Sequence, residues 1–475
     1  MVATADEHAT REGVEVLREG GSVADAGIAI AFVLGVTHPG MCGIGGGGHS
    51  LHRTSGGAFE FLDFRERAPA AATRDMFRAP DVSSTDGWLA AAVPGTVRGL
   101  WHLYRRHGRL PWARLVSPAI RIAREGHAVS WQRSAAARNA AFLRSDPESA
   151  RILLKDPGEV LRQPELAETH ERIAAQGEDG FYAGETAERL VAQMTAHGGA
   201  ITAADLREYR AVERAPLNTS YRGYRVTTAG PPSGGGFSLI RMFEALEGRG
   251  LERLGHNSAA YLDVLARAMS GAVQERVRAV GDPDFGHTTH FNVAAADGEA
   301  LALTFTLNRI YGSGITVPGL GFLLNNNMDN FAARPGEANQ YGLVQYEVNA
   351  IEPGKRPVSS MTPAILTRGG QTALVLGTPG GPTIPGAVLQ IALNVIEFGM
   401  DARQALAAPR IHHQWKPDVL YHEDGFSPDS LRLLEARGHR PEFRESNNDA
   451  MAVKYADGWM EGAADPRREG SADGL

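Results

Sequence analysis

Two adjacent threonines offer the most promising chemistry in this sequence. Thr288-Thr289-His290-Phe291 begins a predicted strand directly after the turn-prone segment 281–287. A threonine hydroxyl is a poor nucleophile unless a nearby base removes its proton. A threonine that becomes an N-terminus supplies that base itself, because the freed α-amine has a pKa of about 8. Threonine is also common in strands, so the motif alone permits this chemistry without requiring it.

Other kinds of catalytic or binding site lack their defining residues. The glycine-rich run at 43–48 is not followed by the Gly-Lys-Ser/Thr of a phosphate-binding loop, which argues against nucleotide binding. His412 and His413 are adjacent, whereas the two histidines of a helical zinc site lie four residues apart. The segment 311–314 has the wrong glycine spacing for a serine nucleophile elbow. Cys42 is the only cysteine, which excludes an intrachain disulfide. We therefore expect no cofactor and no metal.

The composition is typical of a soluble globular protein. The chain has 475 residues, of which 43% are hydrophobic and 22% charged, and its net charge is -7. No cluster of lysine and arginine indicates nucleic-acid binding. The sequence has no run of about 18 apolar residues, and its N-terminus lacks the basic and apolar segments of a secretory signal. We expect a cytoplasmic protein without nucleic-acid or membrane partners.

The first 280 residues precede the threonine pair and must help to position it. They are predicted to be mainly helical. Helices are expected at 8–19, 22–38, 95–107, 117–125, 163–176, 186–197 and 258–280. Strands are expected within 51–64, on either side of a turn at Ser55-Gly56-Gly57, and at 224–228. Ser117-Pro118 matches a helix start, because a capping hydroxyl precedes a proline in the first helical position.

Strands become more frequent beyond Thr289. Segments 290–295 and 300–307 flank Asp297-Gly298, a strong hairpin signal. An apolar strand at 372–377 ends at Pro379-Gly380-Gly381 and precedes a buried helix at 387–398. The polar segment 465–475 is predicted to be a surface tail. Strands alternating with helices indicate a layered α/β (α+β) fold, and no linker or repeat is evident.

Many short motifs follow one another along the chain. They are Glu19-Gly20-Gly21, the glycine run 43–48, Asp63-Phe64-Arg65-Glu66, Ala92-Val93-Pro94-Gly95-Thr96, Tyr221-Arg222-Gly223-Tyr224, Gly281-Asp282-Pro283-Asp284-Phe285, Leu323-Leu324-Asn325-Asn326, residues 355–361, Pro379-Gly380-Gly381, His412-His413-Gln414-Trp415 and Ala464-Asp465-Pro466-Arg467. Together with Thr288-Thr289-His290, this series resembles the γ-glutamyltransferase (γ-glutamyltranspeptidase) family of N-terminal-nucleophile (Ntn) hydrolases over nearly the whole chain.

The resemblance implies a four-layer αββα sandwich that is made as a precursor and cleaves itself before Thr288. Residues 1–287 would form the large-subunit segment and residues 288–475 the small-subunit segment, folded together as one αββα domain. Thr288 would be the nucleophile, and Thr306 would hydrogen-bond to its amine. The backbone N–H groups of Gly380 and Gly381 would form the oxyanion hole, each contributing about 3 kcal/mol. Without the resemblance, the same glycines would be read as a plain turn.

The resemblance also assigns a binding pocket for a substrate carboxylate. Arg65, Ser359 and Ser360 match the residues that hold it, and a guanidinium pairs with a carboxylate through two parallel hydrogen bonds. From the residues alone, Arg65 would instead be a surface ion pair with Asp63 or Glu66. Tyr341 matches a tyrosine of the family's lid loop.

The predicted ammonium pocket departs from the family pattern. The family uses an asparagine, a glutamine or glutamate, and an aspartate, whereas this chain has Asn308, Asn327 and Asn330. A partly buried ammonium without a carboxylate is disfavoured by several kcal/mol. The sequence therefore predicts weak γ-glutamyl transfer and better use of a glutaryl-like amide that carries a carboxylate without the ammonium.

Two further departures concern the walls of the site. Pro382-Thr383 replaces the usual Ser-Arg after the glycine pair, and the segment between Phe285 and Thr288 is much shorter than in relatives. The short segment predicts strained or slow self-cleavage.

Two other functions remain open. One is hydrolysis of a C–C bond in an oxo-acid intermediate of antibiotic biosynthesis, as some relatives perform. The other is a catalytically silent homologue with a scaffold role, although retention of the whole predicted site argues against it.

Overall fold

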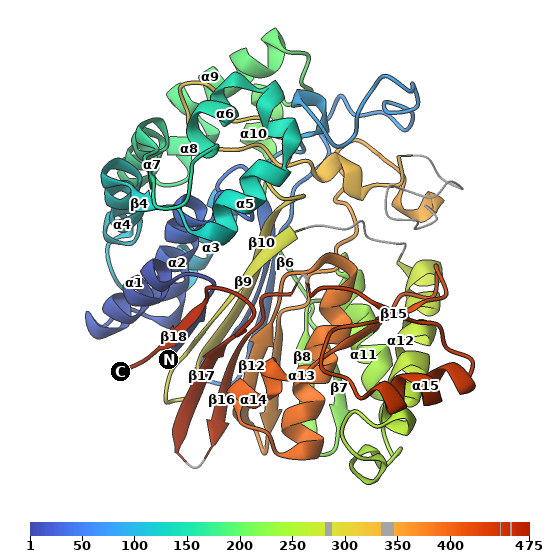
Figure 1. Ribbon diagram of the computed structural model, residues 1–475. Helices are drawn as coiled ribbons and strands as arrows, with labels where there is room; N and C mark the ends of the chain where they lie inside the picture. The colour runs from blue at the N-terminus through green and yellow to red at the C-terminus, as the bar shows by residue number, and fades with distance from the viewer. Residues whose placement is uncertain (281–286, 334–345, 447, 457) are drawn as a thin grey trace.

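Two antiparallel sheets face each other at the centre of the molecule (Figure 1). The computed structural model describes residues 1–280, 287–333, 346–446, 448–456 and 458–475. The larger sheet, sheet A, has the order β18 (Ser471–Asp473), β1 (Val2–Thr4), β9 (His287–Ala294), β10 (Ala300–Asn308), β2 (Gly47–Arg53), β3 (Phe59–Phe64) and β6 (Val212–Arg214). The smaller sheet, sheet B, has the order β17 (Trp459–Ala464), β16 (Met451–Ala456), β12 (Gln371–Gly377), β11 (Ala364–Arg368), β8 (Tyr224–Thr228) and β7 (Leu217–Tyr221).

The central strands of sheet A, β9 and β10, form the predicted hairpin. Gly298 has a φ of 86° in the turn, a left-handed conformation that glycine adopts without strain. The Asp297 carboxylate accepts a hydrogen bond from the backbone N–H of Glu299 at 3.0 Å. The strands pair from Ala300 opposite Ala294 to Thr306 opposite Thr288. The strand β9 begins at residue 287, earlier than the predicted 290, so the threonine pair lies within it.

The two faces of β9 meet different partners. Phe291 lies on the face that packs against α2 (Val23–Thr37), where a Cβ added to Gly27 would be 3.5 Å from its ring. His290 and Asn292 lie on the opposite face, because side chains alternate along a strand. The Nδ2 of Asn292 donates to the carbonyl oxygen of Met451 in sheet B at 2.9 Å. Polar side chains of β9 are therefore enclosed between the sheets.

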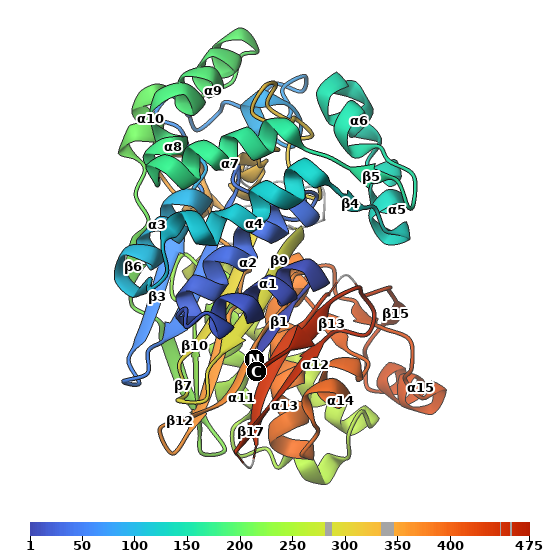
Figure 2. The ribbon, with the colours of Figure 1, turned by 90° about the vertical axis from the view of Figure 1, so that its left-hand side faces the viewer.

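A layer of helices covers the outer face of sheet A (Figure 2). Asp6 caps α1 (Glu7–Arg18), and Ser22 with Asp25 forms a capping box at the start of α2. Helix α2 is buried along its whole length between sheet A and the neighbouring helices. The other helices of this half are α3 (Thr96–His107), α4 (Trp112–Glu125), α5 (Trp131–Asn139), α6 (Pro147–Leu153), α7 (Pro164–Gln176), α8 (Asp179–Tyr182), α9 (Gly184–Ala196) and α10 (Ala203–Glu208); the short strands β4 (His127–Ala128) and β5 (Val160–Leu161) pair among them.

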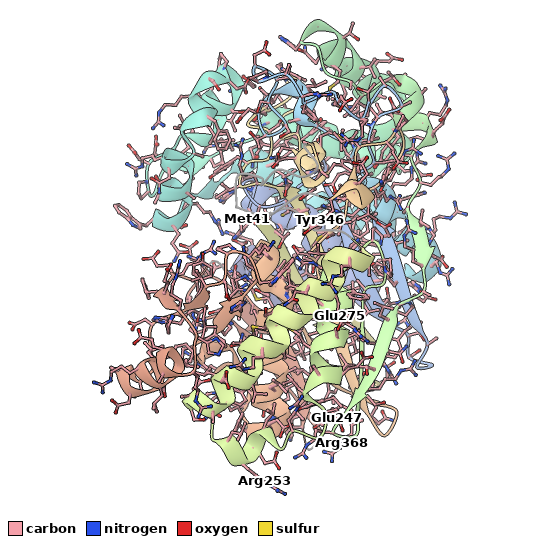
Figure 3. All side chains as sticks on the ribbon, turned by 90° about the vertical axis from the view of Figure 1, so that its right-hand side faces the viewer. Met41, Glu247, Arg253, Glu275, Tyr346 and Arg368 are labelled. Carbon is pink, nitrogen blue, oxygen red and sulfur yellow. The ribbon has the colours of Figure 1, made fainter. Side chains whose placement is uncertain are left out.

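A second group of helices covers sheet B. It comprises α11 (Gly234–Leu246), α12 (Ala259–Ala279), α13 (Ile384–Phe398) and α14 (Ala402–Ala407). Figure 3 views this side, with Glu275 on α12 and Glu247 at the end of α11. A small sheet of β13 (Ile411–His413), β14 (Leu420–His422) and β15 (Pro441–Phe443) lies beside α15 (Pro428–Ala436). The mixed helix-and-sheet fold is confirmed. Within the described residues, no helix is both long and apolar enough to cross a membrane.

The predicted helix start at Ser117-Pro118 is wrong. Helix α4 begins at Trp112, so Pro118 lies inside it. Proline cannot donate a backbone hydrogen bond to the carbonyl oxygen of Arg114. The Ser117 hydroxyl donates to that oxygen at 3.0 Å instead. The Ser117 hydroxyl thus replaces the hydrogen bond that Pro118 cannot donate, and the helix continues through both residues.

The segment 465–475 is not the predicted surface tail. Asp465 is 1% exposed and accepts a hydrogen bond from Nη2 of Arg410 at 2.7 Å. Strand β18 pairs with β1, which brings the two chain ends together at the edge of sheet A (Figure 1). The polar side chains that suggested a tail thus belong to a buried ion-pair network and an edge strand.

We expect Arg410→Met to lower the free energy of unfolding by about 3–5 kcal/mol, because it leaves the buried carboxylate of Asp465 without a principal cationic partner. Arg410 is 2% exposed and also contacts Glu423. Urea denaturation measures the change. Arg432→Met is the control, because Arg432 is exposed and its partner is exposed Asp429. Equal effects of the two substitutions would contradict the structural role of the buried network.

Candidate active site

Thr288 lies between the two sheets with its hydroxyl available. The residue is 3% exposed, and its Oγ1 has no hydrogen-bond partner among the described residues. Thr288 lies two residues before His290 and so shares the face of β9 that points towards sheet B. The ring of His290 contacts β12 directly, since a Cβ added to Gly377 would be 2.3 Å from it. A buried hydroxyl without a hydrogen-bond partner is unusual, and it is consistent with a reactive group.

Thr306 lies beside Thr288 as predicted. The two residues are opposite each other on β10 and β9. The Thr306 Oγ1 accepts a hydrogen bond from the backbone N–H of Asn308 at 2.7 Å. The glycine run allows β2 to approach this point, because a Cβ added to Gly46 would be 1.9 Å from the carbonyl oxygen of Thr306. The glycines therefore serve close packing around the threonine pair.

The Pro379-Gly380-Gly381 turn follows β12 towards the same end of the sheets. At the far end of β12, the Thr372 hydroxyl donates to the carbonyl oxygen of Gly298 at 2.7 Å. At the near end, Gly377 lies against His290. The chain leaving β12 therefore continues in the direction of Thr288. Gly380 has a φ of 134° and Gly381 a φ of 58°, both in the region that favours glycine.

Asn448 and Thr383 hold this turn in place. The Nδ2 of Asn448 donates to the carbonyl oxygen of Pro379 at 2.7 Å and to the Thr383 hydroxyl at 3.0 Å. The Thr383 hydroxyl donates to the carbonyl oxygen of Gly380 at 2.9 Å. Thr383, noted in the sequence as a departure, thus fixes the turn itself. Sequence reasoning missed Asn448, because it lies far along the chain in no recognisable motif.

Arg65 is buried, so the expectation of a surface ion pair is wrong. The side chain is 2% exposed, its Nη1 lies 3.2 Å from Oε2 of Glu66, and its Nε has no hydrogen-bond partner among the described residues. Burial raises the pKa of Glu66 to about 7, although Arg65 opposes this shift. Arg65 therefore retains hydrogen-bonding capacity towards another anion.

Asp63 anchors the segment that carries Arg65, a role that sequence reasoning missed. Its carboxylate accepts hydrogen bonds from Nε of Arg214 at 2.7 Å and Nη1 of Arg356 at 2.9 Å. Despite burial, His49, Arg356 and Arg214 hold the pKa of Asp63 well below its usual range. The pair with Arg356 links the strand before Arg65 to the segment before Ser359.

Ser359 and Ser360 lie in that linked segment, and both are buried, at 2% and 6% exposure. The Ser359 Oγ accepts a hydrogen bond from the backbone N–H of Met361 at 3.1 Å. The backbone N–H of Ser359 donates to the carbonyl oxygen of Pro232 at 3.1 Å. These contacts fix Ser359, in the segment that the Asp63–Arg356 pair links to the strand before Arg65.

The three predicted asparagines gather at the end of β10. The Nδ2 of Asn308 donates to the carbonyl oxygen of Asn326 at 3.2 Å, and Asn330 donates to Oδ1 of Asn327. All three are at most 2% exposed. The neighbouring Asp329 accepts a hydrogen bond from the Ser84 hydroxyl at 2.5 Å. The structure therefore brings the three neutral amides together, with the Asp329 carboxylate beside them bonded to Ser84. Tyr341 lies outside the described residues.

A hollow of about 230 Å³ adjoins this end of the sheets. It is lined mainly by apolar side chains, among them Met41 (labelled in Figure 3) and Ile310, and by Asp449, the neighbour of Asn448. Burial raises the pKa of Asp449 to about 8, which favours its neutral form at pH 7. A hollow of about 560 Å³ at the hairpin end of the sheets contains none of the candidate residues.

Known proteins resemble this chain over its whole length. The profile of the family described as Gamma-glutamyltranspeptidase matches residues 9–287 and 285–475. The glutathione hydrolase proenzyme of Escherichia coli (strain K12) is 39% identical over 522 residues, covering 98% of this chain and 90% of that protein. Cephalosporin acylase from Bacillus halodurans has a TM-score of 0.87 and 26% identity, covering 100% of this chain and 95% of that chain. The gamma-glutamyltranspeptidase from Pseudomonas nitroreducens complexed with L-DON has a TM-score of 0.56 and 39% identity, covering 58% of this chain and 85% of that chain.

Glu66 should make the stability of the protein depend on pH. Its folded pKa of about 7 exceeds the value of about 4.3 for an unfolded glutamate, so between these values the folded state binds more protons. The contribution of Glu66 to the free energy of unfolding is on the order of 3 kcal/mol. It is fully present below about pH 4 and is lost as the pH rises through 7. We expect Glu66→Gln to flatten the decline in the free energy of unfolding between about pH 5 and pH 8. An unchanged decline would show that Glu66 ionises normally.

Proposed function

The chain belongs to the gamma-glutamyltranspeptidase family, and from this premise we propose a self-cleaving N-terminal-threonine hydrolase or acyltransferase for amides whose acyl group carries a carboxylate. The observation that carries the proposal is the buried, unbonded hydroxyl of Thr288 beside Thr306, at the end of β9 towards which the glycine turn runs. The relatives named as enzymes and proenzymes support this assignment. The proposal includes the four-layer αββα Ntn-hydrolase sandwich, divided into residues 1–287 and 288–475 of one domain.

Self-cleavage would begin with attack by the Thr288 hydroxyl oxygen on the carbonyl carbon of residue 287. The peptide C–N bond breaks as the ester C–O bond forms, and the nitrogen takes up the hydroxyl proton. Water then hydrolyses the ester, leaving a carboxylate on residue 287 and a free amine on Thr288. The solved gamma-glutamyltranspeptidase of Pseudomonas nitroreducens supports this division, because its matched chain covers 58% of this chain, close to the share of residues 1–287.

In turnover, the new amine of Thr288 would take the proton of its own hydroxyl. The oxygen attacks the substrate carbonyl, and the backbone N–H groups of Gly380 and Gly381 stabilise the oxyanion. The amine product leaves with the proton, and water or a second amine releases the acyl group. Asn448 and Thr383 support this step by fixing the glycine turn in advance.

The proposed substrate follows from the charges of the pocket. Arg65, Ser359 and Ser360 would bind the carboxylate, since Arg65 keeps a free Nε in a buried setting. Asn308, Asn327 and Asn330 form a neutral cluster, which cannot compensate an ammonium as a carboxylate does. A glutaryl-like amide fits better than a γ-glutamyl amide, and the full-length likeness to a cephalosporin acylase supports an amide substrate. The same neutral cluster makes an oxo-acid, cleaved at a C–C bond, the second candidate.

Thr288→Ala should leave the chain whole, whereas the wild type should separate into two fragments divided before Thr288. Intact-mass spectrometry distinguishes one species from two. Thr289→Ala is the matched control, because Thr289 is equally buried but faces away from sheet B, so this variant should still cleave. A wild-type chain that stays whole after prolonged incubation would favour a scaffold role.

The wild type should hydrolyse a glutaryl anilide with a higher kcat/KM than the matching γ-glutamyl anilide. Asn330→Asp should raise kcat/KM for the γ-glutamyl compound about 10- to 100-fold, because it supplies a charge-assisted contact to the ammonium. The glutaryl compound serves as the control, since it lacks the ammonium. A wild-type preference for the γ-glutamyl compound would refute the argument from Asn330. Cleavage of neither anilide by a self-cleaved protein would favour the oxo-acid substrate.

A further inference from the structure

A cluster of histidines and carboxylates lies at the end of sheet A opposite to Thr288. His52 on β2 pairs across the sheet with Glu60 on β3. His107 is the last residue of α3, and Glu299 lies between the turn of the β9–β10 hairpin and β10. His52 and Glu60 belong to one hairpin, whereas His107 and Glu299 come from distant parts of the chain, so the spacing in the sequence does not indicate the cluster.

The cluster contains a buried imidazole nitrogen without a hydrogen bond. His52 is 1% exposed, and its Nδ1 has no hydrogen-bond partner among the described residues. This nitrogen lies 3.7 Å from Oε2 of Glu60, and Nε2 of His107 lies 2.6 Å from the same oxygen. The three ligand atoms are all within 4.8 Å of one another. In a tetrahedral zinc site, ligand atoms about 2.0–2.2 Å from the metal are separated by roughly 3.4 Å, so small side-chain rotations suffice.

Glu299 orients the buried histidine for this role. Its Oε1 lies 2.9 Å from Nε2 of His52. When Nε2 carries the proton for this bond, the lone pair of Nδ1 points towards Glu60. A histidine that ligates a metal commonly donates its other N–H to a carboxylate in this way.

The surrounding charges leave the ligand atoms accessible. Arg106 contacts the other oxygen of Glu60, with Nη2 at 2.8 Å from Oε1, so Oε2 is the oxygen that faces the two imidazoles. A metal would replace the hydrogen bond between Oε2 and His107. The side chains of Glu60 and His107 are 26% and 17% exposed, so solvent reaches the cluster, and a water would serve as the fourth ligand.

We propose that His52, Glu60 and His107 bind one Zn²⁺ ion, with Glu299 positioning His52. The ion would join the end of α3 to strands β2 and β3 of sheet A, at the end of the sheet opposite to Thr288. Two nitrogen ligands and one carboxylate suit zinc, whereas calcium and magnesium prefer oxygen ligands alone.

A charged His52 is the competing explanation of the same geometry. Although burial opposes it, the carboxylates of Glu299 and Glu60 raise the pKa of His52. An imidazolium between two carboxylates needs no metal. The two explanations differ in whether the protein takes up an ion.

Metal binding is tested on the full-length protein after chelator treatment and dialysis. We expect one Co²⁺ per chain with the visible absorption of four-coordinate cobalt, displaced by Zn²⁺, and a higher melting temperature with Zn²⁺. His107→Gln and Glu60→Gln should abolish uptake, and Glu299→Gln should weaken it about 10- to 100-fold. Wild-type protein that takes up no ion, and whose melting temperature Zn²⁺ does not change, would establish the charged-histidine explanation.

His102→Gln is the matched control. His102 lies on the same helix as His107 but contacts Glu213, at 2.8 Å, and none of the proposed ligands. Uptake should survive this substitution, and its loss would overturn the assignment. The Thr288→Ala protein should also bind the ion, so the outcome does not depend on whether the proposed self-cleavage occurs.

Discussion

The close approach of β9 to sheet B determines how Thr288 lies relative to the glycine turn. The ring of His290 occupies the space that a side chain at Gly377 would need, and Asn292 bonds to the backbone of Met451. The first contact is made to a glycine and the second to a backbone carbonyl, so neither depends on a flexible side chain of sheet B. Together they fix the distance between β9 and sheet B. A residue larger than glycine at 377 would clash with the ring of His290, so either that ring or β12, with the Pro379–Gly381 turn, would have to move. The polar interface therefore positions the two halves of the site against each other.

The charge balance around the site depends on which carboxylates the arginines pair with. Asp63 engages Arg214 and Arg356, whereas Arg65 contacts Glu66, whose raised pKa makes it a partly protonated partner near pH 7. The positive charge of Arg65 is therefore incompletely compensated in a buried place, a condition that favours binding of a carboxylate. The asparagines at the end of β10 supply no opposite charge. This charge balance is the basis on which we propose an anionic substrate in preference to a zwitterion.

Local signals in the sequence predicted the local structure, and contacts between distant segments account for the rest. The Asp297-Gly298 hairpin and the helix that starts after Ser22 depend on neighbouring residues, so the sequence predicts both. The helix start predicted at Pro118 was wrong because the Ser117 hydroxyl makes the hydrogen bond that Pro118 cannot donate, so the helix continues through the proline. The polar segment 465–475 misled it because its partners, Arg410 and β1, are remote in sequence. Asn448 and His52 were missed for the same reason, since each acts on groups that only the fold brings near.

The pairing of β9 with β10 also bears on the bond proposed to break. The register shifts between Thr306 and Asn308, opposite the link between residues 287 and 288. Asn308 has a φ of 78°, a left-handed conformation that costs a residue other than glycine about 1–3 kcal/mol. The regular ladder thus ends at the Thr288–Thr306 pair, and the backbone of residue 287 pairs with Asn308 beyond the register shift. Cleavage there would release the preceding segment without disturbing the ladder from Thr288 onwards. A new N-terminus would then form in a site whose walls are already in place, which is what a nucleophile that supplies its own base requires.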